Sequence, residues 1–269
     1  MGIINVTPDS FADRGLRLDA QRAVEDALAM EAQGADIIDV GGESTRPGAE
    51  PLSADEEIAR IEPVVRGLAT RLGIPISIDT YKAPVAEVAL DLGAAIVNDI
   101  SALSYDPALA RLVAGRRAAV ILMHTRGRSA DMYRHAEYGD VVVDVAHELE
   151  ARCRVAADAG IRTNCILVDP GIGFAKRAEQ SSMVVARLQE LGSLGYPVVA
   201  GPSRKSFLMR AIGERLPGER EFATAAGVTA CVLAGAHVVR VHDVAAMTDV
   251  VRVADMIRRD GGLDREDSP

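Results

Sequence analysis

The chain has little of what stabilises small secreted domains or membrane proteins. Its cysteines, Cys153, Cys165 and Cys231, are odd in number and widely spaced, so neither a disulfide framework nor a zinc pair is predicted, and we expect core thiols in a reducing compartment. No apolar run approaches the roughly 20 residues of a membrane span. The first residues also lack the basic-then-apolar pattern of a secretory signal. We therefore expect a cytoplasmic protein.

Positive charge is also in the minority. The chain has 30 Lys and Arg against 39 Asp and Glu, a net charge of -9, which disfavours nucleic acid and anionic lipid as partners. Basic residues that bind a ligand must therefore form a local cluster. The hydrophobic share of 48% supports a sizeable core and argues against disorder. A length of 269 residues fits one α/β barrel or two smaller domains.

Several well-known catalytic motifs are missing from the sequence. There is no G-x-S-x-G elbow, no H-E-x-x-H, no C-x-x-C and no Walker-type loop. The stretch DPGIGF at 169–174 contains G-x-G but lacks the rest of a dinucleotide-binding fingerprint. Covalent catalysis and zinc chemistry are therefore not expected.

What the sequence does contain is a regular alternation of short β-branched runs with longer stretches of helical period. The predicted strands are Gly2–Asn5, Asp36–Val40, Pro75–Asp79, Ala95–Asn98, Ala119–Met123, Cys165–Asp169, Pro197–Gly201 and Val238–Val241. The predicted helices are 19–34, 53–73, 82–93, 107–115, 141–160, 180–193, 221–235 and 244–260. Ser53 and Glu56 have the spacing of a capping box at the start of the second helix.

These elements predict a single-domain (β/α)8 barrel. Strands that are almost wholly apolar belong to a parallel sheet covered on both faces, and eight strand–helix units without a long linker favour closure. An open, doubly wound sheet is the alternative. We expect the barrel to span residues 1–260 and the tail at 261–269 to be disordered.

Polar residues close nearly every predicted strand. In a parallel barrel all these ends face the same way, toward the rim where barrel enzymes bind their ligands. The residues are Asn5, Asp39, Asp79, Asn98, His124 after Met123, Asp169, and the stretches GPSRKS at 201–206 and RVHD at 240–243. Their joint occurrence predicts a ligand site at this rim.

Each of these residues also has a purely structural explanation. Asp79 could cap the next helix, and Asn98 could hydrogen-bond within its own turn. Arg240 could pair with Asp243, and His242 could be a hydrogen-bonded core histidine. Asp169 could simply shape the turn that follows it. The structural explanations leave unexplained why successive strands all end in polar groups.

The charges indicate what kind of ligand would bind. Buried carboxylates such as Asp79 and Asp169 are costly unless paired, and Lys205 supplies a cation. A flat ring with several N–H donors, such as an aminopyrimidinone, would satisfy these carboxylates. Asn5, Arg240 and His242 come from the first and last strands, which are neighbours in a closed barrel. They suit a phosphate-like group with a divalent metal on the Asn5 oxygen.

Eight motifs in order resemble those of the dihydropteroate synthase family. They are MGIINVTPDSFADRG, DVGGESTRPGA, SIDTYKAPVAEVAL, VNDIS, LMH, LVDPGIGFAK, GPSRKSF and VRVHDV, and they cover essentially the whole chain. The resemblance implies a (β/α)8 barrel and a transferase of folate biosynthesis. In that reaction, 4-aminobenzoate displaces pyrophosphate from 6-hydroxymethyl-7,8-dihydropterin pyrophosphate, with Mg2+ as cofactor.

The resemblance also implies roles for individual residues. Those implied to hold the pterin are Asp79, Asn98, Met123, Asp169, Gly201 and Lys205. Those implied for pyrophosphate are Asn5, which also meets Mg2+, Thr45, Arg240 and His242. Those implied for aminobenzoate, and for sulfonamide inhibitors, are Phe11, Thr45, Arg46, Pro47, Phe174, Lys205 and Ser206. The residues expected to be catalytic are Lys205, Arg240, His242 and Asp79.

Further expectations follow from the same resemblance. Arg204 is expected to have a structural role, and two loops, Thr7–Leu16 and Gly42–Pro51, are expected to close over the site. The family usually forms homodimers through helices late in the chain. Arg14 departs from the family, which usually has glycine there. Two rival functions remain: a methyltetrahydrofolate-binding methyltransferase domain with a corrinoid partner, and a binding-only relative without turnover.

Overall fold

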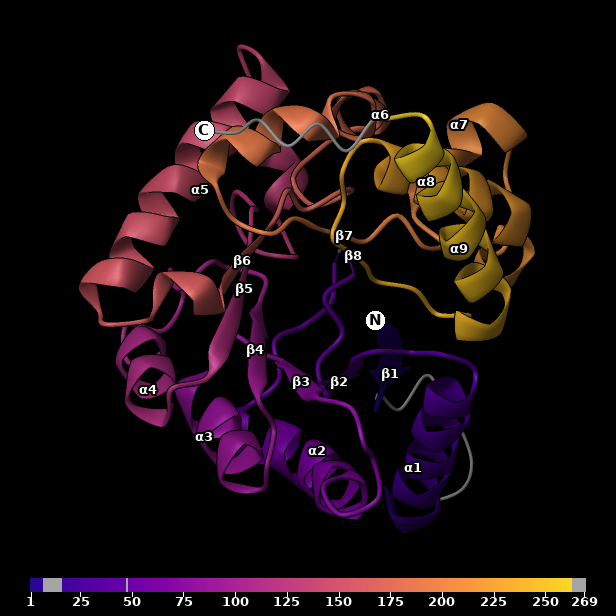
Figure 1. The fold of residues 1–269 in the computed structure, drawn as a ribbon. Helices are drawn as coiled ribbons and strands as arrows, with labels where there is room; N and C mark the ends of the chain where they lie inside the picture. The colour runs from indigo at the N-terminus through magenta and orange to yellow at the C-terminus, as the bar shows by residue number, and fades with distance from the viewer. Residues whose placement is uncertain (7–15, 47, 263–269) are drawn as a thin grey trace.

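A computed structural model describes residues 1–6, 16–46 and 48–262 of the chain. Phe11, Arg14, Pro47 and the predicted tail from residue 263 onward lie outside this part. Within it, strands and helices alternate along the chain, and the helices surround the strands (Figure 1).

The strands form a closed parallel barrel. Six of them make one continuous sheet in the order β1 to β6, and β7 pairs with β8. A parallel bridge between Val168 and Val198 joins the two sheets on one side, and a bridge between Gly2 and Val241 joins them on the other. The strands are β1 Gly2–Asn5, β2 Ile38–Gly41, β3 Ile76–Asp79, β4 Ile96–Asp99, β5 Ala119–Met123, β6 Ile166–Asp169, β7 Val199–Ala200 and β8 Val238–Val239. The closed barrel is confirmed, and the open sheet is excluded.

The helices follow the predicted pattern with two changes. They are α1 Leu16–Ala32, α2 Ala54–Leu68, α3 Ala83–Asp91, α4 Leu109–Arg116, α5 Val141–Asp158, α6 Ala178–Ala186, α7 Met209–Ile212, α8 Glu221–Leu233 and α9 Val244–Asp260. The helix predicted at 180–193 divides into α6 and the 3-10 helix η4 Leu188–Leu194, because Arg187 leaves the helical region at φ -117° and ψ 23°. The short α7 was not predicted. The capping box of Ser53 and Glu56 is present at the start of α2.

Among the described residues, four further 3-10 turns lie in the connections between these elements. They are η2 Met132–His135, η3 Thr163–Cys165, η5 Ser206–Leu208 and η6 Pro217–Glu219. Cys165 ends η3 and is partly exposed, whereas Cys153 and Cys231 are buried, and all three thiols are free. The expectation of three core thiols is therefore wrong for Cys165, which lies at a connection rather than inside a strand.

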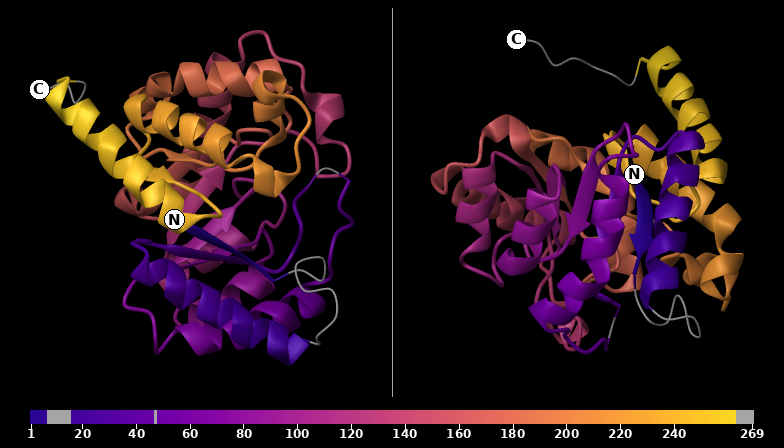
Figure 2. Two further views of the ribbon diagram at one scale, coloured as in Figure 1. Left: turned by 90° about the vertical axis from the view of Figure 1, so that its right-hand side faces the viewer. Right: turned by 90° about the horizontal axis from the view of Figure 1, so that it is seen from below.

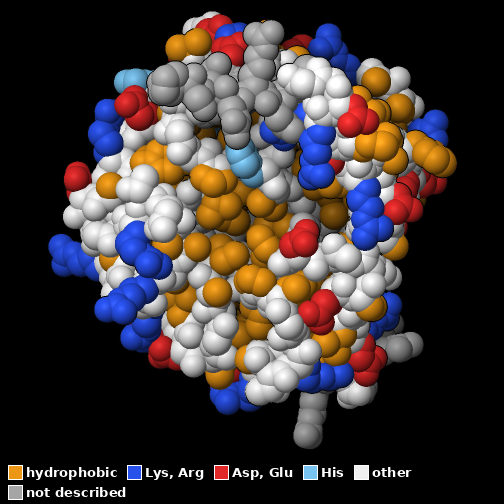
Figure 3. Space-filling view, in the orientation of Figure 1, with side chains coloured by type: hydrophobic (Ala, Val, Ile, Leu, Met, Phe, Trp, Pro, Cys, Tyr) orange, Lys and Arg blue, Asp and Glu red, His pale blue; other side chains and the backbone are white. Residues whose placement is uncertain are grey.

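The two ends of the barrel differ in polarity. The N-terminus lies at the amino ends of the strands, opposite the carboxyl ends (Figure 2). Met1, Ile96, Ile121 and Val199 form a small apolar cluster, and apolar side chains gather around the middle of the face seen in Figure 3, on which the N-terminus lies. Polar side chains collect at the other end. In the described part of the chain, no helix is long and apolar enough to cross a membrane.

Candidate active site

Three charged residues meet across the mouth of the barrel. Arg240, just after β8, donates from Nε to Oδ2 of Asp39 on β2 at 2.6 Å, and from Nη2 to Oδ2 of Asp79 on β3 at 2.7 Å. The side-chain amide of Asn98 on β4 donates to the same Asp39 oxygen at 3.0 Å. One guanidinium therefore ties the ends of three strands together.

The buried carboxylate of Asp39 and the partly buried carboxylate of Asp79 share this single guanidinium. Burial raises the pKa of Asp79 to about 7, with Arg240 opposing the shift and Asp39 adding to it. The other oxygen of Asp39, Oδ1, is buried without a hydrogen-bond partner in the described structure. Because these acceptors outnumber their donors, the mouth favours a ligand that brings N–H groups.

On the opposite side of the mouth, Asp169 and Lys205 lie close together without a direct ion pair. The backbone N–H of Gly171 donates to Asp169 Oδ1 at 2.7 Å, and burial raises the pKa of this carboxyl. The ammonium of Lys205 lies 3.9 Å from the centroid of the Phe174 ring, and burial lowers its pKa to about 8. No carboxylate of the described residues lies within ion-pair distance of Lys205. Its donors are therefore available to a ligand.

His242 lies beside the charged pocket and is neutral. Its Nδ1 is 2.9 Å from Oγ of Ser203, which also accepts from the His242 backbone at 3.3 Å. Burial, reinforced by nearby arginines and Lys205, lowers the pKa of His242 to about 3. His242 and Asn5 line one cavity of about 390 Å³ together with Arg22 and Arg204. A neutral imidazole there contributes a hydrogen bond rather than a positive charge.

Several structural explanations for these residues fail. Asp79 does not cap α3, which follows Lys82 without a side-chain capping bond. Asn98 binds Asp39 instead of its own turn. Arg240 pairs with Asp39 and Asp79, whereas Asp243 caps α9 by accepting from the N–H of Ala246 at 3.0 Å. The explanation for Asp169 holds in part, because its carboxylate does stabilise the turn at Gly171.

The basic stretch after β7 divides into structural and ligand-facing residues. Arg204 has φ 58°, its N–H donates to Thr224 Oγ1 at 3.0 Å, and its carbonyl accepts from Arg220 at 2.7 Å. These contacts fix the turn that presents Lys205. Ser206 is exposed at the start of η5.

The other predicted site residues lie around the same mouth or outside the described residues. Met123 ends β5 and is buried, and Gly201 follows β7 with its Cα facing the Arg240 side chain. Thr45 and Arg46 follow β2, and the charge of Arg46 contributes to the low pKa of His242. Phe11 and Pro47 lie outside the described residues.

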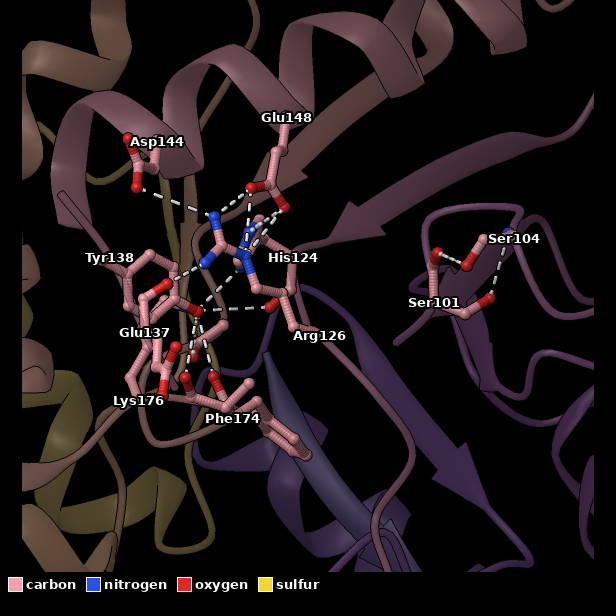
Figure 4. A network of polar contacts seen from close by, with 12 residues as sticks. Ser101, Ser104, His124, Arg126, Glu137, Tyr138, Asp144, Glu148, Phe174 and Lys176 are labelled. Carbon is pink, nitrogen blue, oxygen red and sulfur yellow. Dashed lines mark hydrogen bonds and ion pairs between the residues drawn. The ribbon is translucent and has the colours of Figure 1, made fainter. Parts of the chain in front are cut away.

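Two parts of the site were not assigned a role from the sequence. Asp39 was noted only as a polar residue inside the second strand, although a carboxylate in the apolar run IIDVGG is itself a signal of an inward-facing charge. Lys176 follows Asp169 and Phe174 and forms a buried network with His124 and the turn between β6 and α6 (Figure 4). A lysine after GIGFA resembles an ordinary loop cation in the sequence.

The donor set at Asn5 fits a magnesium ion. The described residues contain no group of three or more His, Cys, Asp or Glu side chains that could hold a metal. Mg2+ usually keeps several waters and takes one or two protein oxygens together with substrate phosphates. One carboxamide oxygen in a cavity lined by two arginines matches that pattern, whereas a zinc or calcium site would need more protein ligands.

The fold and the mouth together define a (β/α)8-barrel enzyme with a charged ligand pocket at the carboxyl ends of its strands. Residues 1–242 match the family model described as "Pterin binding enzyme". The chain is 44% identical to the dihydropteroate synthase of Synechocystis, with 96% of this chain and 90% of the relative covered, and 41% identical to that of Bacillus subtilis, with 98% and 90% covered.

Solved structures agree with these relatives. The dihydropteroate synthase of Xanthomonas albilineans with 4-aminobenzoic acid matches with a TM-score of 0.90 and 40% identity, covering 96% of this chain and 92% of that one. The Yersinia pestis enzyme in a sulfonamide complex matches with a TM-score of 0.90 and 36% identity, covering 96% and 94%. The chain therefore belongs to the dihydropteroate synthase family of pterin-binding transferases.

Proposed function

We propose that the chain joins 4-aminobenzoate to 6-hydroxymethyl-7,8-dihydropterin pyrophosphate, giving 7,8-dihydropteroate and pyrophosphate. The observation that carries this proposal is the grouping of Asp79, Asp169 and Lys205 at one barrel mouth, where acceptors for ring N–H groups lie beside an unpaired cation. The Xanthomonas albilineans relative has also been solved with 7,8-dihydropteroate. Synthesis in the cytoplasm stays a prediction.

The pterin would lie between the two charged sides of the mouth. Its N–H donors would meet the carboxylates of Asp79 and Asp169, and the Lys205 ammonium would donate to an acceptor on the ring. Asn98 would offer its carboxamide oxygen and its second amide N–H, because one amide N–H already binds Asp39. Met123 and Gly201 would line the slot.

The aminobenzoate would lie beside the pterin against the Phe174 ring. Lys205 lies over this ring, so it would contact both substrates. Ser206 would meet the carboxylate of the benzoate, and the loop after β2 would cover it with Thr45, Arg46 and Pro47, as Phe11 would from the loop after β1. We propose that sulfonamides occupy the same pocket, as a sulfonamide does in the Yersinia pestis complex.

The chemistry needs no protein nucleophile. The carbon–oxygen bond to pyrophosphate breaks with its electron pair leaving on the phosphate, the amine nitrogen bonds the methylene carbon, and the amine then loses a proton to solvent. The electron-rich dihydropterin supports positive charge on the methylene, so a dissociative order is proposed. Positioning two reactants supplies about 7–11 kcal/mol in well-oriented systems. Pre-steady-state kinetics in which pyrophosphate never departs before the amine attacks would contradict the dissociative order.

The pyrophosphate would lie toward β1 and β8. Arg240 and the neutral His242 would donate to its oxygens, with Thr45 from the loop after β2. Asn5 would hold Mg2+, which when bound neutralises charge on the leaving pyrophosphate. We propose that the loops at 7–16 and 42–51 close over the substrates and exclude water.

One assay separates this function from its rivals. Purified protein is mixed with the pterin pyrophosphate, Mg2+ and labelled 4-aminobenzoate, and labelled dihydropteroate is measured by chromatography. We expect product and pyrophosphate in equal amounts, both inhibited by a sulfonamide. Pterin binding without product would instead support a binding-only relative, and methyl transfer to a corrinoid protein would support the methyltransferase.

We also propose a homodimer through the late helices. Phe222 at the start of α8 is 93% exposed and Leu216 before η6 is 70% exposed, and Val253, Met256 and Ile257 on α9 are exposed too. Large exposed apolar side chains are typical of subunit interfaces. Light scattering should show a dimer that Phe222→Asp converts to monomer, and a monomeric wild-type protein would contradict this.

A further inference from the structure

Lys176 is a buried lysine that the proposed reaction does not use, and burial lowers its pKa to about 7. It is 1% exposed and follows the turn Gly171–Ala175, which connects β6 to α6. Lysine occurs at only three positions in the chain, 82, 176 and 205, among 30 basic residues. Because arginine is the usual basic residue here, a lysine at this buried position calls for a geometric reason.

Backbone carbonyls surround the Lys176 ammonium. Its Nζ lies 3.1 Å from the carbonyl oxygen of Phe174, 3.2 Å from that of Gly171 and 3.4 Å from that of His124 (Figure 4). It also lies 2.9 Å from Nδ1 of His124. A compact ammonium with three donors fits such a cage, whereas a planar guanidinium does not.

His124 connects this cation to a carboxylate nearer the surface. Its Nε2 lies 3.0 Å from Glu148 on α5, and a carboxylate only accepts, so Nε2 carries the proton and Nδ1 accepts from Lys176. Burial and the Lys176 charge lower the pKa of His124 to about 4, in agreement with a neutral ring. Glu148 is itself held by Arg126, whose Nε donates to it at 3.0 Å. The imidazole therefore has a fixed orientation toward Lys176.

The turn that Lys176 holds has an unusual backbone. Gly171, Gly173 and Ala175 have φ of 68°, 81° and 47°, in the left-handed region that L side chains rarely adopt. A Cβ at Gly171 would lie 2.0 Å from the His124 carbonyl oxygen, so the turn packs directly on the end of β5. The hydroxyl of Tyr138 donates to the Ala175 carbonyl at 2.9 Å. The turn also has one backbone hydrogen bond of its own, from the Phe174 N–H to the Gly171 carbonyl at 3.0 Å, and the Gly173 N–H donates to Ser181 Oγ at 3.2 Å. Side-chain groups and this single backbone bond thus maintain the conformation.

The turn places the Phe174 ring and the Gly173 backbone against Lys205. The Phe174 ring lies beneath the Lys205 ammonium at 3.9 Å. Gly173 packs on the stem of Lys205, since a Cβ there would lie 3.3 Å from its Cδ. A shift of the turn would therefore move the ring and the Lys205 side chain together. Asp169 would move less, because it pairs with Met123 in the β5–β6 ladder.

We propose that Lys176 is a positioning residue: by binding the carbonyls of Gly171, Phe174 and His124 it sets the turn that places Phe174 against Lys205. Its effect on turnover rests on the proposed function, because Phe174 is assigned there to the aminobenzoate side. Removing the ammonium should impair aminobenzoate use more than pterin use. The geometric part of the proposal can be tested without any turnover.

The test uses three variants of the full chain beside wild type. Lys176→Met removes the donors but keeps the stem, and Lys176→Arg keeps the charge but changes the donor geometry. The matched control is Leu68→Ala, which weakens the core at a fully buried position of α2, a helix that packs on α1, α3 and β2. Hydrogen exchange of the Gly173 and Phe174 amides is measured first, followed by kcat and both KM values.

Both lysine variants should exchange these amides at least tenfold faster than wild type, while Leu68→Ala should change them no more than the rest of the barrel. The aminobenzoate KM should rise about tenfold or more in both lysine variants, with the pterin KM within about threefold. Unchanged exchange, full rescue by arginine, or equal rises of both KM values would overturn the proposal.

Two further experimental outcomes also bear on the proposal. If both lysine variants fail to fold, Tyr138→Phe removes one donor to the turn and should give a smaller rise in the same exchange rates, and an unchanged rate there would overturn the proposal. If wild-type protein forms no dihydropteroate, the proposed function fails. The exchange rates alone then decide whether Lys176 sets the turn.

Discussion

Around the ends of β2, β3 and β8, buried charges pair directly with one another, whereas around β6 and β7 two lysines are held by neutral groups. Arg240 lies between the carboxylates of Asp39 and Asp79. Lys205 lies over an aromatic ring, and Lys176 lies among backbone carbonyls. Each side has one fully buried residue, Asp39 or Lys176, beside partly buried ones, so the difference lies in which charges the protein itself compensates.

This difference separates charged residues that mainly stabilise the fold from charged residues that mainly bind a ligand. A buried ion pair loses several kcal/mol when one partner is removed, because the other charge is left uncompensated. A buried cation without a paired carboxylate already bears its desolvation cost, so its removal should harm binding more than folding. Removing a charge on the paired side should thus affect mainly stability, and removing one on the unpaired side should affect mainly ligand affinity.

The largest expected effect is on the paired side. Arg240→Met leaves Asp39 and Asp79 buried without their cation, and we expect a loss of about 3–5 kcal/mol in the free energy of unfolding, measured in urea. The control is Arg187→Met, which removes surface pairs with Asp140 and Glu190 and should cost far less stability, because solvent screens such pairs. Equal losses in the two variants would abolish the distinction between the two sides.

Lys205→Ala should act in the opposite way. Because the ammonium is not paired with a carboxylate, we expect unfolding to change by less than about 1 kcal/mol. The KM values for both substrates should rise, with kcat/KM falling on the order of 10²–10³-fold, since the cation contacts both. Steady-state kinetics with each substrate varied in turn provide the measurement. Wild-type kinetics would remove Lys205 from the site.

Asp79→Asn should have a smaller and more selective effect. The change keeps the shape of the side chain but replaces one acceptor oxygen by an NH2 group that only donates, and one hydrogen bond is typically worth about 0.5–1.5 kcal/mol. We expect the pterin KM to rise about tenfold and the aminobenzoate KM to change by no more than about twofold. An increase confined to aminobenzoate would contradict the pterin assignment.

The smallest effect expected is a change in the pH dependence of stability. Burial raises the pKa of Asp79 to about 7 in the folded protein, against 3.8 for an ordinary aspartate. The folded state therefore binds a proton that the unfolded state has released, and this group alone makes stability fall as pH rises from about 4 to about 7. Between pH 5 and pH 7.5, wild type should lose more stability than Asp79→Asn, by on the order of 1 kcal/mol. Parallel pH profiles would count against the raised pKa.

The fold could be predicted closely from the sequence because its signal is local. The apolar β-branched runs located all eight strands, and the strand ends differ by one or two residues. The main differences are at β7 and β8, which are shorter than predicted. Next to Pro197, and where the barrel closes, strand pairing is reduced to single bridges such as Val168–Val198. The shortening of these two strands depends on barrel geometry and not on local strand propensity.

The site could be predicted only in part, because which residues form it depends on where each side chain points and on how deeply it is buried in the folded barrel. Asn98, Asp169 and Lys205 stand at strand ends, where position alone indicates the rim. The partners of Arg240 could not be predicted, since Asp39 meets it only through the register of β2 across the barrel. Lys176 could not be recognised either, because its carbonyl cage exists only once the turn at 171–175 has folded.

The most direct test of the account is a crystal structure of the protein with a pterin bound. We predict ring N–H donors on the carboxylates of Asp79 and Asp169, the Lys205 ammonium on an acceptor of the same ring, and Arg240 still bound to Asp39. A pterin bound elsewhere, or one that contacts neither carboxylate, would contradict it.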